Sequence, residues 1–181
     1  MKTRHFQKYF YALCILLLAV PLASNPARSE LPPFANLNAG LEETEAYLHQ
    51  SINRIRGQHG LPSLKDSPTL RQIARDHSRY MARSGYLGHG NGGGRDFRSR
   101  IERAKVKGWR VVGENVGRSF GYRNNADEIV SGWMESEPHR KNILSRKFDT
   151  TGIGTALAED GTLYATQVFL GSADHTSDMT K

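Results

Sequence analysis

The spacing of apolar residues changes along the chain from a helical to a strand-like period, and this change limits the folds open to it. In residues 66–85 apolar side chains recur every three or four positions, as on one face of an amphipathic helix. In residues 151–171 apolar and small residues alternate on both sides of the turn sequence EDG, as expected of an antiparallel hairpin. Helices followed by a hairpin predict an α+β fold, with helices packed on a small, mainly antiparallel sheet.

The first two expected helices begin and end at residues that are typical of helix ends. The first helix is expected from about Leu41 to Gly60, with acidic residues in its first turns. The second is expected to have Ser67 as its N-cap and Pro68 at its first position, and Gly85 closes it.

Further elements are expected between this helix and the hairpin. Asp96 can cap a shorter helix that ends at Gly108, and residues 109–117 read as an extended strand. A capping box from Asn125 to Glu128 predicts the start of the last helix.

The beginning of the chain has the pattern of a secretory signal peptide. Three basic residues precede an apolar stretch at residues 9–23, and small residues follow it, so cleavage is expected after Ala23 or after Ser29. The apolar stretch is shorter than the roughly 20 residues of a spanning helix, so no stable membrane anchor is expected. The protein is therefore predicted to be secreted, into the periplasm or the extracellular space.

The rest of the chain is long enough for one domain. We expect residues 1–29 to be the signal peptide, 30–40 a linker, 41–171 the folded domain and 172–181 a disordered tail.

The cysteine content argues against a disulfide-stabilised domain, and the net charge argues against a nucleic-acid-binding protein. The only cysteine, Cys14, lies in the expected signal peptide, so the mature domain has no disulfide and depends on its core, or on a metal, for stability. Four basic residues also lie there, and their removal lowers the formal net charge from +7 to +3. We therefore expect no nucleic-acid partner.

The glycine-rich stretch GHGNGGGRD at residues 88–96 does not fit a phosphate-binding loop, because no Lys-Ser or Lys-Thr follows and no strand precedes it. It is expected instead to be a turn that presents His89. His139 also lies in a turn, and Glu114 ends an apolar run between the two histidines. Two imidazoles and a carboxylate are a recurrent ligand set for zinc, whereas the alternative for Glu114 is a structural carboxylate bonded to backbone amides.

Four motifs in order resemble the CAP (SCP-like) superfamily, which includes cysteine-rich secretory proteins, antigen 5 and pathogenesis-related proteins. They are HSRYMARSGYLGHG, GENVG, SGWMESEPHRKNIL and TGIGTALAEDGTLYATQVF, and the likeness runs from about residue 48 to residue 170. It is strongest to the bacterial branch without cysteines. The resemblance implies an α-β-α sandwich with a central cleft.

In many members of this superfamily two histidines and two glutamates in the cleft can bind a divalent metal. The resemblance places His89, Glu114 and His139 at three of these positions, with His89 and His139 as ligands of Zn²⁺ or another divalent ion. The fourth position holds Ser136 here, with Glu135 and Glu137 on either side of it. Glu137 is a candidate to approach the cleft from the turn before His139, and the alternative for both glutamates is a solvated side chain. Arg140 is expected at the cleft rim or in a surface salt bridge.

Three functions stay open from the sequence. The favoured one is a binding module whose cleft receives a small ligand, lipid, peptide or glycan. The alternative is a metal-dependent hydrolase in which Glu114 activates bound water. The third is a domain whose polar cluster only stabilises the fold. Covalent hydrolysis is not expected, because the mature chain lacks cysteine and no GxSxG occurs.

Overall fold

A computed structural model describes residues 34–90, 96–122 and 124–173. The expected signal peptide and the tail beyond residue 173 lie outside these residues. Within the described ranges, no helix is long and apolar enough to cross a membrane.

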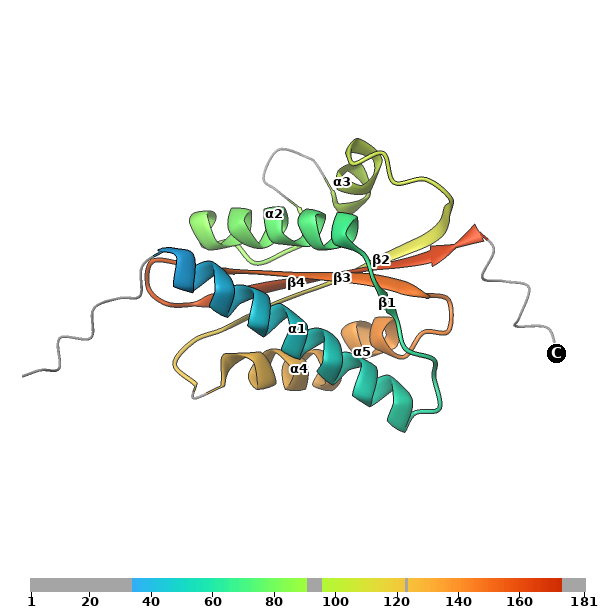
Figure 1. Ribbon diagram of the computed structural model, residues 1–181, viewed down its shortest axis with the longest axis horizontal. Helices are drawn as coiled ribbons and strands as arrows, with labels where there is room; N and C mark the ends of the chain where they lie inside the picture. The colour runs from blue at the N-terminus through green and yellow to red at the C-terminus, as the bar shows by residue number, and fades with distance from the viewer. Residues whose placement is uncertain (1–33, 91–95, 123, 174–181) are drawn as a thin grey trace, which may run out of the picture. The chain divides into compact units, whose positions relative to one another are not determined.

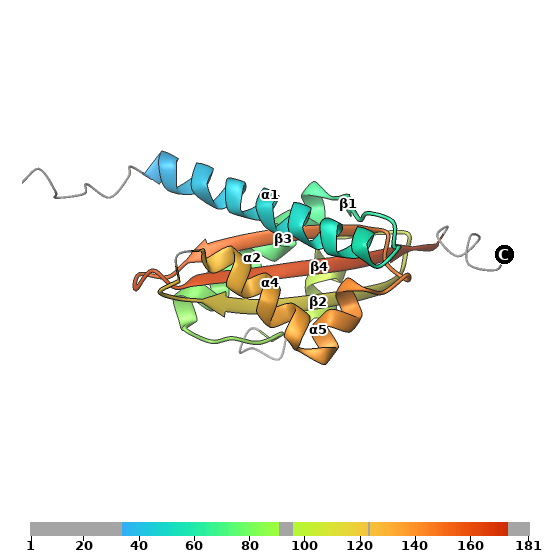
Figure 2. The same cartoon turned by 90° about the horizontal axis from the view of Figure 1, so that it is seen from below.

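Three layers make up the domain, with a mixed sheet between two layers of helices (Figures 1 and 2). The sheet order is β1-β3-β4-β2, and the strands are β1 (Lys65–Asp66), β2 (Trp109–Ser119), β3 (Thr150–Leu157) and β4 (Leu163–Ser172). Only the short β1 runs parallel to its neighbour; the other pairs are antiparallel. One face carries α2 (Pro68–Ser84) and α3 (Phe97–Arg103), and the other carries α1 (Phe34–Gln58), α4 (Asn125–Glu135) and α5 (Glu137–Ile143). This architecture confirms the α+β class and the α-β-α sandwich.

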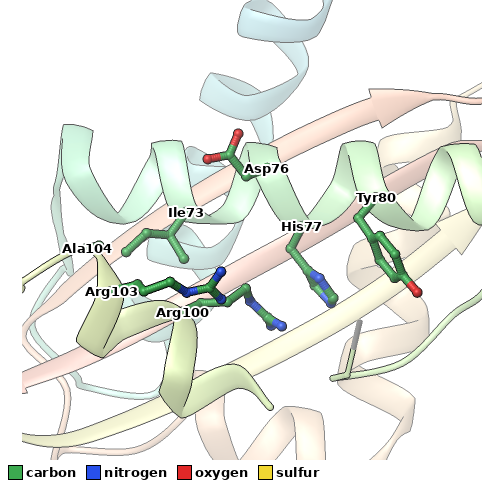
Figure 3. A pocket seen from close by; sticks show the side chains of 7 residues that line it. All are labelled: Ile73, Asp76, His77, Tyr80, Arg100, Arg103 and Ala104. Carbon is green, nitrogen blue, oxygen red and sulfur yellow. The ribbon is translucent and has the colours of Figure 1, made fainter. Parts of the chain in front are cut away.

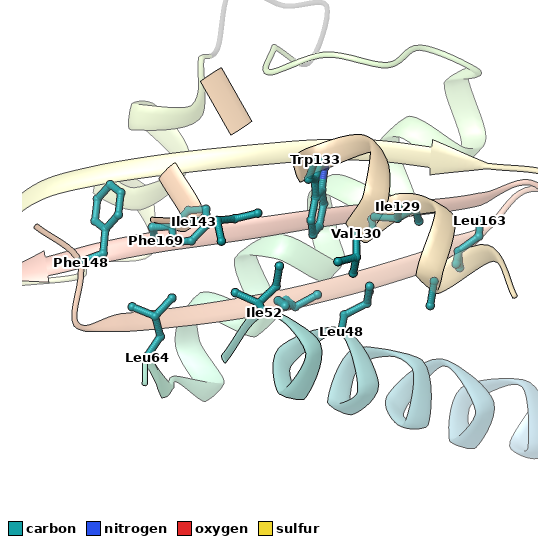
Figure 4. Packing of buried hydrophobic residues seen from close by; sticks show 13 residues of the cluster. Leu48, Ile52, Leu64, Ile129, Val130, Trp133, Ile143, Phe148, Leu163 and Phe169 are labelled. Carbon is teal, nitrogen blue, oxygen red and sulfur yellow. The ribbon is translucent and has the colours of Figure 1, made fainter. Parts of the chain in front are cut away.

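The larger apolar core lies between the sheet and the layer of α1, α4 and α5 (Figure 4). Leu48 and Ile52 of α1 are fully buried against it. Trp133 of α4 is 2% exposed, and its indole Nε1 donates a hydrogen bond to the Val116 carbonyl at 3.0 Å. The core therefore also fixes α4 against β2.

The opposite face depends on an unusually close approach between α2 and β3. A Cβ atom at Gly152 would lie 2.1 Å from the backbone nitrogen of Arg71, and one at Gly154 would lie 2.0 Å from that of Arg75. No side chain fits in this space, so only glycine permits the contact. Ser78 Oγ donates to the Gly154 carbonyl at 2.8 Å, which ties the helix to the strand where they touch.

Several local predictions are confirmed. Ser67 is the N-cap of α2 and accepts from the Leu70 amide, and Gly85 closes the helix in the left-handed conformation at φ 67°. Asp96 caps α3 by accepting from the Ser99 amide at 2.9 Å. The hairpin forms from β3 and β4, which pair antiparallel.

Four boundaries differ from the predictions. Helix α1 begins at Phe34, inside the predicted linker of residues 30–40, because no proline follows Pro33 to prevent helix formation. Helix α3 ends at Arg103 rather than near Gly108, since Lys105 adopts a left-handed backbone at φ 54°.

The N-cap of α4 is Asn124 rather than Asn125. The Asn124 side-chain oxygen accepts from the Ala126 and Asp127 amides at 3.1 and 3.3 Å. Asn125 instead accepts from the Ser119 hydroxyl at 2.9 Å. At the other end of the domain, Ser172 belongs to β4, so the ordered part extends into the predicted tail of residues 172–181.

The close approach of α2 and β3 predicts that Gly154→Ala lowers the free energy of unfolding by about 1–3 kcal/mol or more, because the new methyl group meets backbone atoms. Denaturant unfolding measures this loss. Gly132→Ala in α4 is the matched control, since nothing lies within 4 Å of its Cβ position. It should stabilise the protein by about 0.5–1 kcal/mol. Equal effects of the two substitutions would contradict the close approach.

Candidate functional site

Glu114 lies in the middle of β2, and its side chain faces the layer of α2 and α3. It pairs with Val168 of β4, which packs with Leu70 and Ile73 of α2, and directly opposed residues of an antiparallel pair lie on the same face. The Glu114 side chain is only 2% exposed. A buried carboxylate needs partners, and the structure supplies two.

Both oxygens of the Glu114 carboxylate are occupied. Oε2 accepts from Nη2 of Arg100 at 2.5 Å, and Oε1 lies 2.9 Å from Nδ1 of His89. Arg100 comes from α3 and is 9% exposed. Its Nη1 also donates to the His89 carbonyl at 2.9 Å, so one guanidinium holds both the carboxylate and the loop that carries His89.

His89 bridges this buried pair and the surface. Its side chain is 55% exposed, although Nδ1 points to Glu114. The hydrogen bond to Glu114 raises the pKa of His89 above its ordinary value, and this effect outweighs burial and the nearby charge of Arg100, which lower it. With Nδ1 donating to the carboxylate, the other ring nitrogen remains for a ligand.

His139 belongs to α5, in the layer of helices on the other face of the sheet (Figure 1), and its backbone is bonded to β2. Asn115 donates to the His139 carbonyl at 3.1 Å, and Asn142 donates to the Glu114 carbonyl at 3.2 Å. These bonds fix α5 on the strand. Burial lowers the pKa of His139, and the positive charge of His89 lowers it further.

His77 is the hydrogen-bonded core histidine that its position on α2 predicts. It is 1% exposed, and its Nε2 lies 2.8 Å from the Gly88 carbonyl. This bond fixes the loop one residue before His89. Through this bond the His77 side chain of α2 positions the backbone next to the exposed His89.

The other two predicted cleft residues, Glu137 and Arg140, both belong to α5. Glu137 is exposed in the first turn of α5. Arg140 donates to the Met134 carbonyl at 2.9 Å, which ties α5 to the end of α4. Neither shares a hydrogen bond with the cluster among the described residues.

Arg100 is the site residue that the sequence reasoning missed. It lies on the same face of α3 as Phe97 and next to Ile101, so an arginine on an apolar face was the available signal. A buried arginine needs acceptors for its N–H groups, and the buried carboxylate of Glu114 supplies one that also balances its charge.

The residues present do not fit a three-ligand metal site in this arrangement. No three His, Cys, Asp or Glu side chains gather as a metal-binding group in the described part of the chain. Glu114, the expected third ligand, already has Arg100 as its cation. Metal binding by His89 and His139 therefore stays a prediction.

The ion pair predicts a large loss of stability when its cation is removed. Arg100→Met should lower the free energy of unfolding by about 3–5 kcal/mol, because Glu114 stays buried without a counter-ion. Adding Glu114→Gln should recover part of this loss, so the double variant loses less than the sum of the single variants. Arg98→Met is the control: the exposed pair of Arg98 and Glu102 at 3.7 Å should contribute less than about 1 kcal/mol. Additive single losses would contradict the coupling.

The two histidines should titrate on opposite sides of the ordinary pKa of 6.5, with His89 above it and His139 below it. The bond from His89 to Glu114 therefore stabilises the fold fully below pH 6.5 and loses this effect as the pH rises through the pKa of folded His89. For His139 the sign is reversed: its contribution is present above pH 6.5 and is lost as the pH falls through its lowered pKa.

Ring signals followed by NMR test these directions. Glu114→Gln should lower the pKa of His89, because the bond that raises it is weakened. A His89 pKa that does not respond would disprove the assignment of Glu114 as its partner.

Comparison with known proteins agrees with this arrangement of elements. Residues 49–169 match the model of the cysteine-rich secretory protein family, CAP. The "Uncharacterized protein YkwD" of Bacillus subtilis (strain 168) is 34% identical over 121 residues, which cover 66% of this chain and 44% of that protein. The "Uncharacterized membrane protein YlbC" of the same organism is 32% identical over 112 residues, 61% of this chain and 31% of that protein. The chain thus spans less than half the length of these curated relatives.

Solved structures show the same fold. An extracellular protein containing a SCP domain from Bacillus anthracis str. Ames superposes with a TM-score of 0.69 and 26% identity, covering 80% of this chain and 45% of that one. An outer surface protein from Borrelia burgdorferi gives a TM-score of 0.64 at 17% identity, with 72% and 93% covered, and shows likeness of fold alone. With the family model matched over most of the domain, the chain belongs to the cysteine-rich secretory protein (CAP) family, and its likeness is to bacterial members.

Proposed function

We propose that this protein is a secreted binding module whose site at His89 and His139 receives a small acidic group, such as a carboxylate or phosphate. The observation that carries the proposal is that the two carboxylate oxygens of Glu114 each have a partner, Arg100 for one and His89 for the other. Because Arg100 already neutralises the carboxylate, a protonated His89 gives the cluster an excess positive charge next to solvent. An anion is the ligand that this charge favours.

His139 supports the same ligand from the opposite side. Burial and the positive charge of His89 lower its pKa, so its ring favours the uncharged form, which can donate or accept a hydrogen bond. One charged and one neutral imidazole can bind an acidic group by one ion pair and one hydrogen bond. Among the ligand classes open from the sequence, lipids, peptides, glycans and small molecules with an acidic group fit best.

The hydrolase alternative is less well supported. It requires Glu114 to take a proton from water. One carboxylate oxygen of Glu114 already accepts a hydrogen bond from Arg100, however, and the other lies 2.9 Å from Nδ1 of His89. The arrangement of Glu114, Arg100 and His89 is suited to holding a bound ligand in place.

Secretion is part of the proposal. It rests on the basic and apolar pattern of residues 1–29. Two proteins of similar structure are described as an extracellular protein and an outer surface protein.

Inorganic phosphate is a direct probe of the site. We expect phosphate titrations of the purified protein, followed by the ring signals of both histidines in NMR, to show binding that weakens at least tenfold in His89→Ala and in His139→Ala. Binding should also weaken as the pH rises through the raised pKa of His89, because the imidazole loses its charge. His59→Ala is the control, since His59 is exposed just beyond the end of α1. Phosphate affinity that is unchanged in both site variants would refute the proposal.

Calorimetric titration with Zn²⁺ tests the separate proposal of a metal at His89 and His139. Because Arg100 competes for Glu114, zinc should bind more tightly to Arg100→Met than to the unchanged protein. Zinc binding that depends on neither histidine would exclude the metal site.

A further inference from the structure

A pocket lies between α2 and α3, beside the buried side chain of Arg100. Its volume is about 340 Å³, at the lower end of the range for small-molecule sites. We call it the α2–α3 pocket, and its lining residues are Ile73, Asp76, His77, Tyr80, Arg100, Arg103 and Ala104. Ile73 and His77 project from α2 on the side of α3, Tyr80 lies further along α2, and the side chains of Arg100 and Arg103 lie below α2 (Figure 3).

His77 brings an unused hydrogen-bond acceptor to this pocket. Its Nε2 lies 2.8 Å from the Gly88 carbonyl, and a carbonyl can only accept, so Nε2 carries the proton. Burial lowers the pKa of His77, which keeps the ring neutral. Nδ1 is therefore a lone-pair acceptor, and this nitrogen is buried without a partner among the described residues.

Arg100 brings an unused donor. Its two terminal nitrogens donate to the His89 carbonyl and to Glu114, but its Nε–H is buried and has no partner in the described ranges. A buried polar atom without a partner is unusual in a native protein and calls for an explanation. Here two such atoms, one acceptor and one donor, belong to side chains that line the same pocket.

The remaining walls are mostly apolar. Ile73, Ala104 and the ring of Tyr80 form them, and the Tyr80 ring stacks on His77 with centroids 6.2 Å apart. Asp76 is directed away from the pocket (Figure 3), and its carboxylate accepts from Gln72 and Arg79 instead. The polar character of the pocket is thus concentrated at His77 and the two arginines.

We propose that the α2–α3 pocket binds a small neutral ligand made of an apolar or aromatic group and a carboxamide. The amide N–H would donate to Nδ1 of His77, and its carbonyl would accept from Nε–H of Arg100. A carboxylate offers acceptors only, so it would leave the lone pair of Nδ1 facing another lone pair.

This site is independent of the anion site proposed at His89 and His139. It uses a different nitrogen of Arg100 and none of the atoms that face solvent at His89. Either site can therefore fail its test without the other.

Benzamide is the probe that matches this chemistry, and benzoate is its matched control because it lacks the N–H donor. In titrations of the ¹⁵N-labelled protein we expect benzamide to shift backbone amide signals of α2 and α3 and to bind at least tenfold more tightly than benzoate. N-acetylglucosamine carries an amide on a polyhydroxylated ring, and it should bind more weakly than benzamide because the walls are apolar. Equal affinities for benzamide and benzoate, or no shifts with benzamide, would overturn the proposal.

A substitution that fills the pocket gives a second test. Ala104 is exposed at the end of α3, so Ala104→Phe should place a ring in the pocket and weaken benzamide binding at least tenfold without preventing folding. Ala46→Phe adds the same ring at an exposed position of α1 and should leave benzamide binding unchanged. Tyr80→Ala removes a wall and should also weaken binding. Benzamide affinity unaffected by both pocket variants would place its binding elsewhere and contradict the assignment.

Discussion

The contact between α2 and β3 at Gly152 and Gly154 is the constraint on which the rest of the site depends. The helix backbone touches the strand where a methyl group would already overlap with it. Because α2 lies this close to the sheet, His77 is buried and reaches the carbonyl of Gly88. The loop that follows the helix is thereby held over β2, with His89 next to Glu114.

Arg100 completes this arrangement from a separate helix. Its guanidinium binds Glu114 and the His89 carbonyl together, so α3, the loop and β2 are joined at one buried charge. A buried carboxylate can be stabilised by a metal ion or by an arginine, and this chain has the arginine in place. The exposed imidazole of His89 is then the part of the cluster that can meet a ligand.

Local chemistry makes much of the fold predictable. Ser67, Gly85 and Asp96 act within a few residues of their own position, so their roles as helix ends can be read from the sequence. The hairpin of β3 and β4 is predictable for the same reason, since its alternation and its turn are contiguous. The start of α4 differs by one residue because Asn124 and Asn125 are chemically identical, and only the backbone distinguishes the cap.

The site is harder to predict because its members meet only in three dimensions. His89 and Glu114 stand out by their residue types and by the family resemblance, and the structure brings them within 2.9 Å. Arg100 stands out less, since it is one of three arginines in α3 and only its place on the same helix face as Phe97 distinguishes it. Glu137 and Arg140 follow one another closely in the sequence, but Arg140 bonds to the Met134 carbonyl, and neither residue shares a hydrogen bond with the cluster in the described ranges.

A crystal structure of the protein grown with Zn²⁺ present would test most directly whether Arg100 is the cation of this site. We predict density for the Arg100 guanidinium against Glu114 and a backbone hydrogen bond to His89, as in the arrangement described above. A zinc ion bound by His89, His139 and Glu114, with Arg100 turned away, would contradict it.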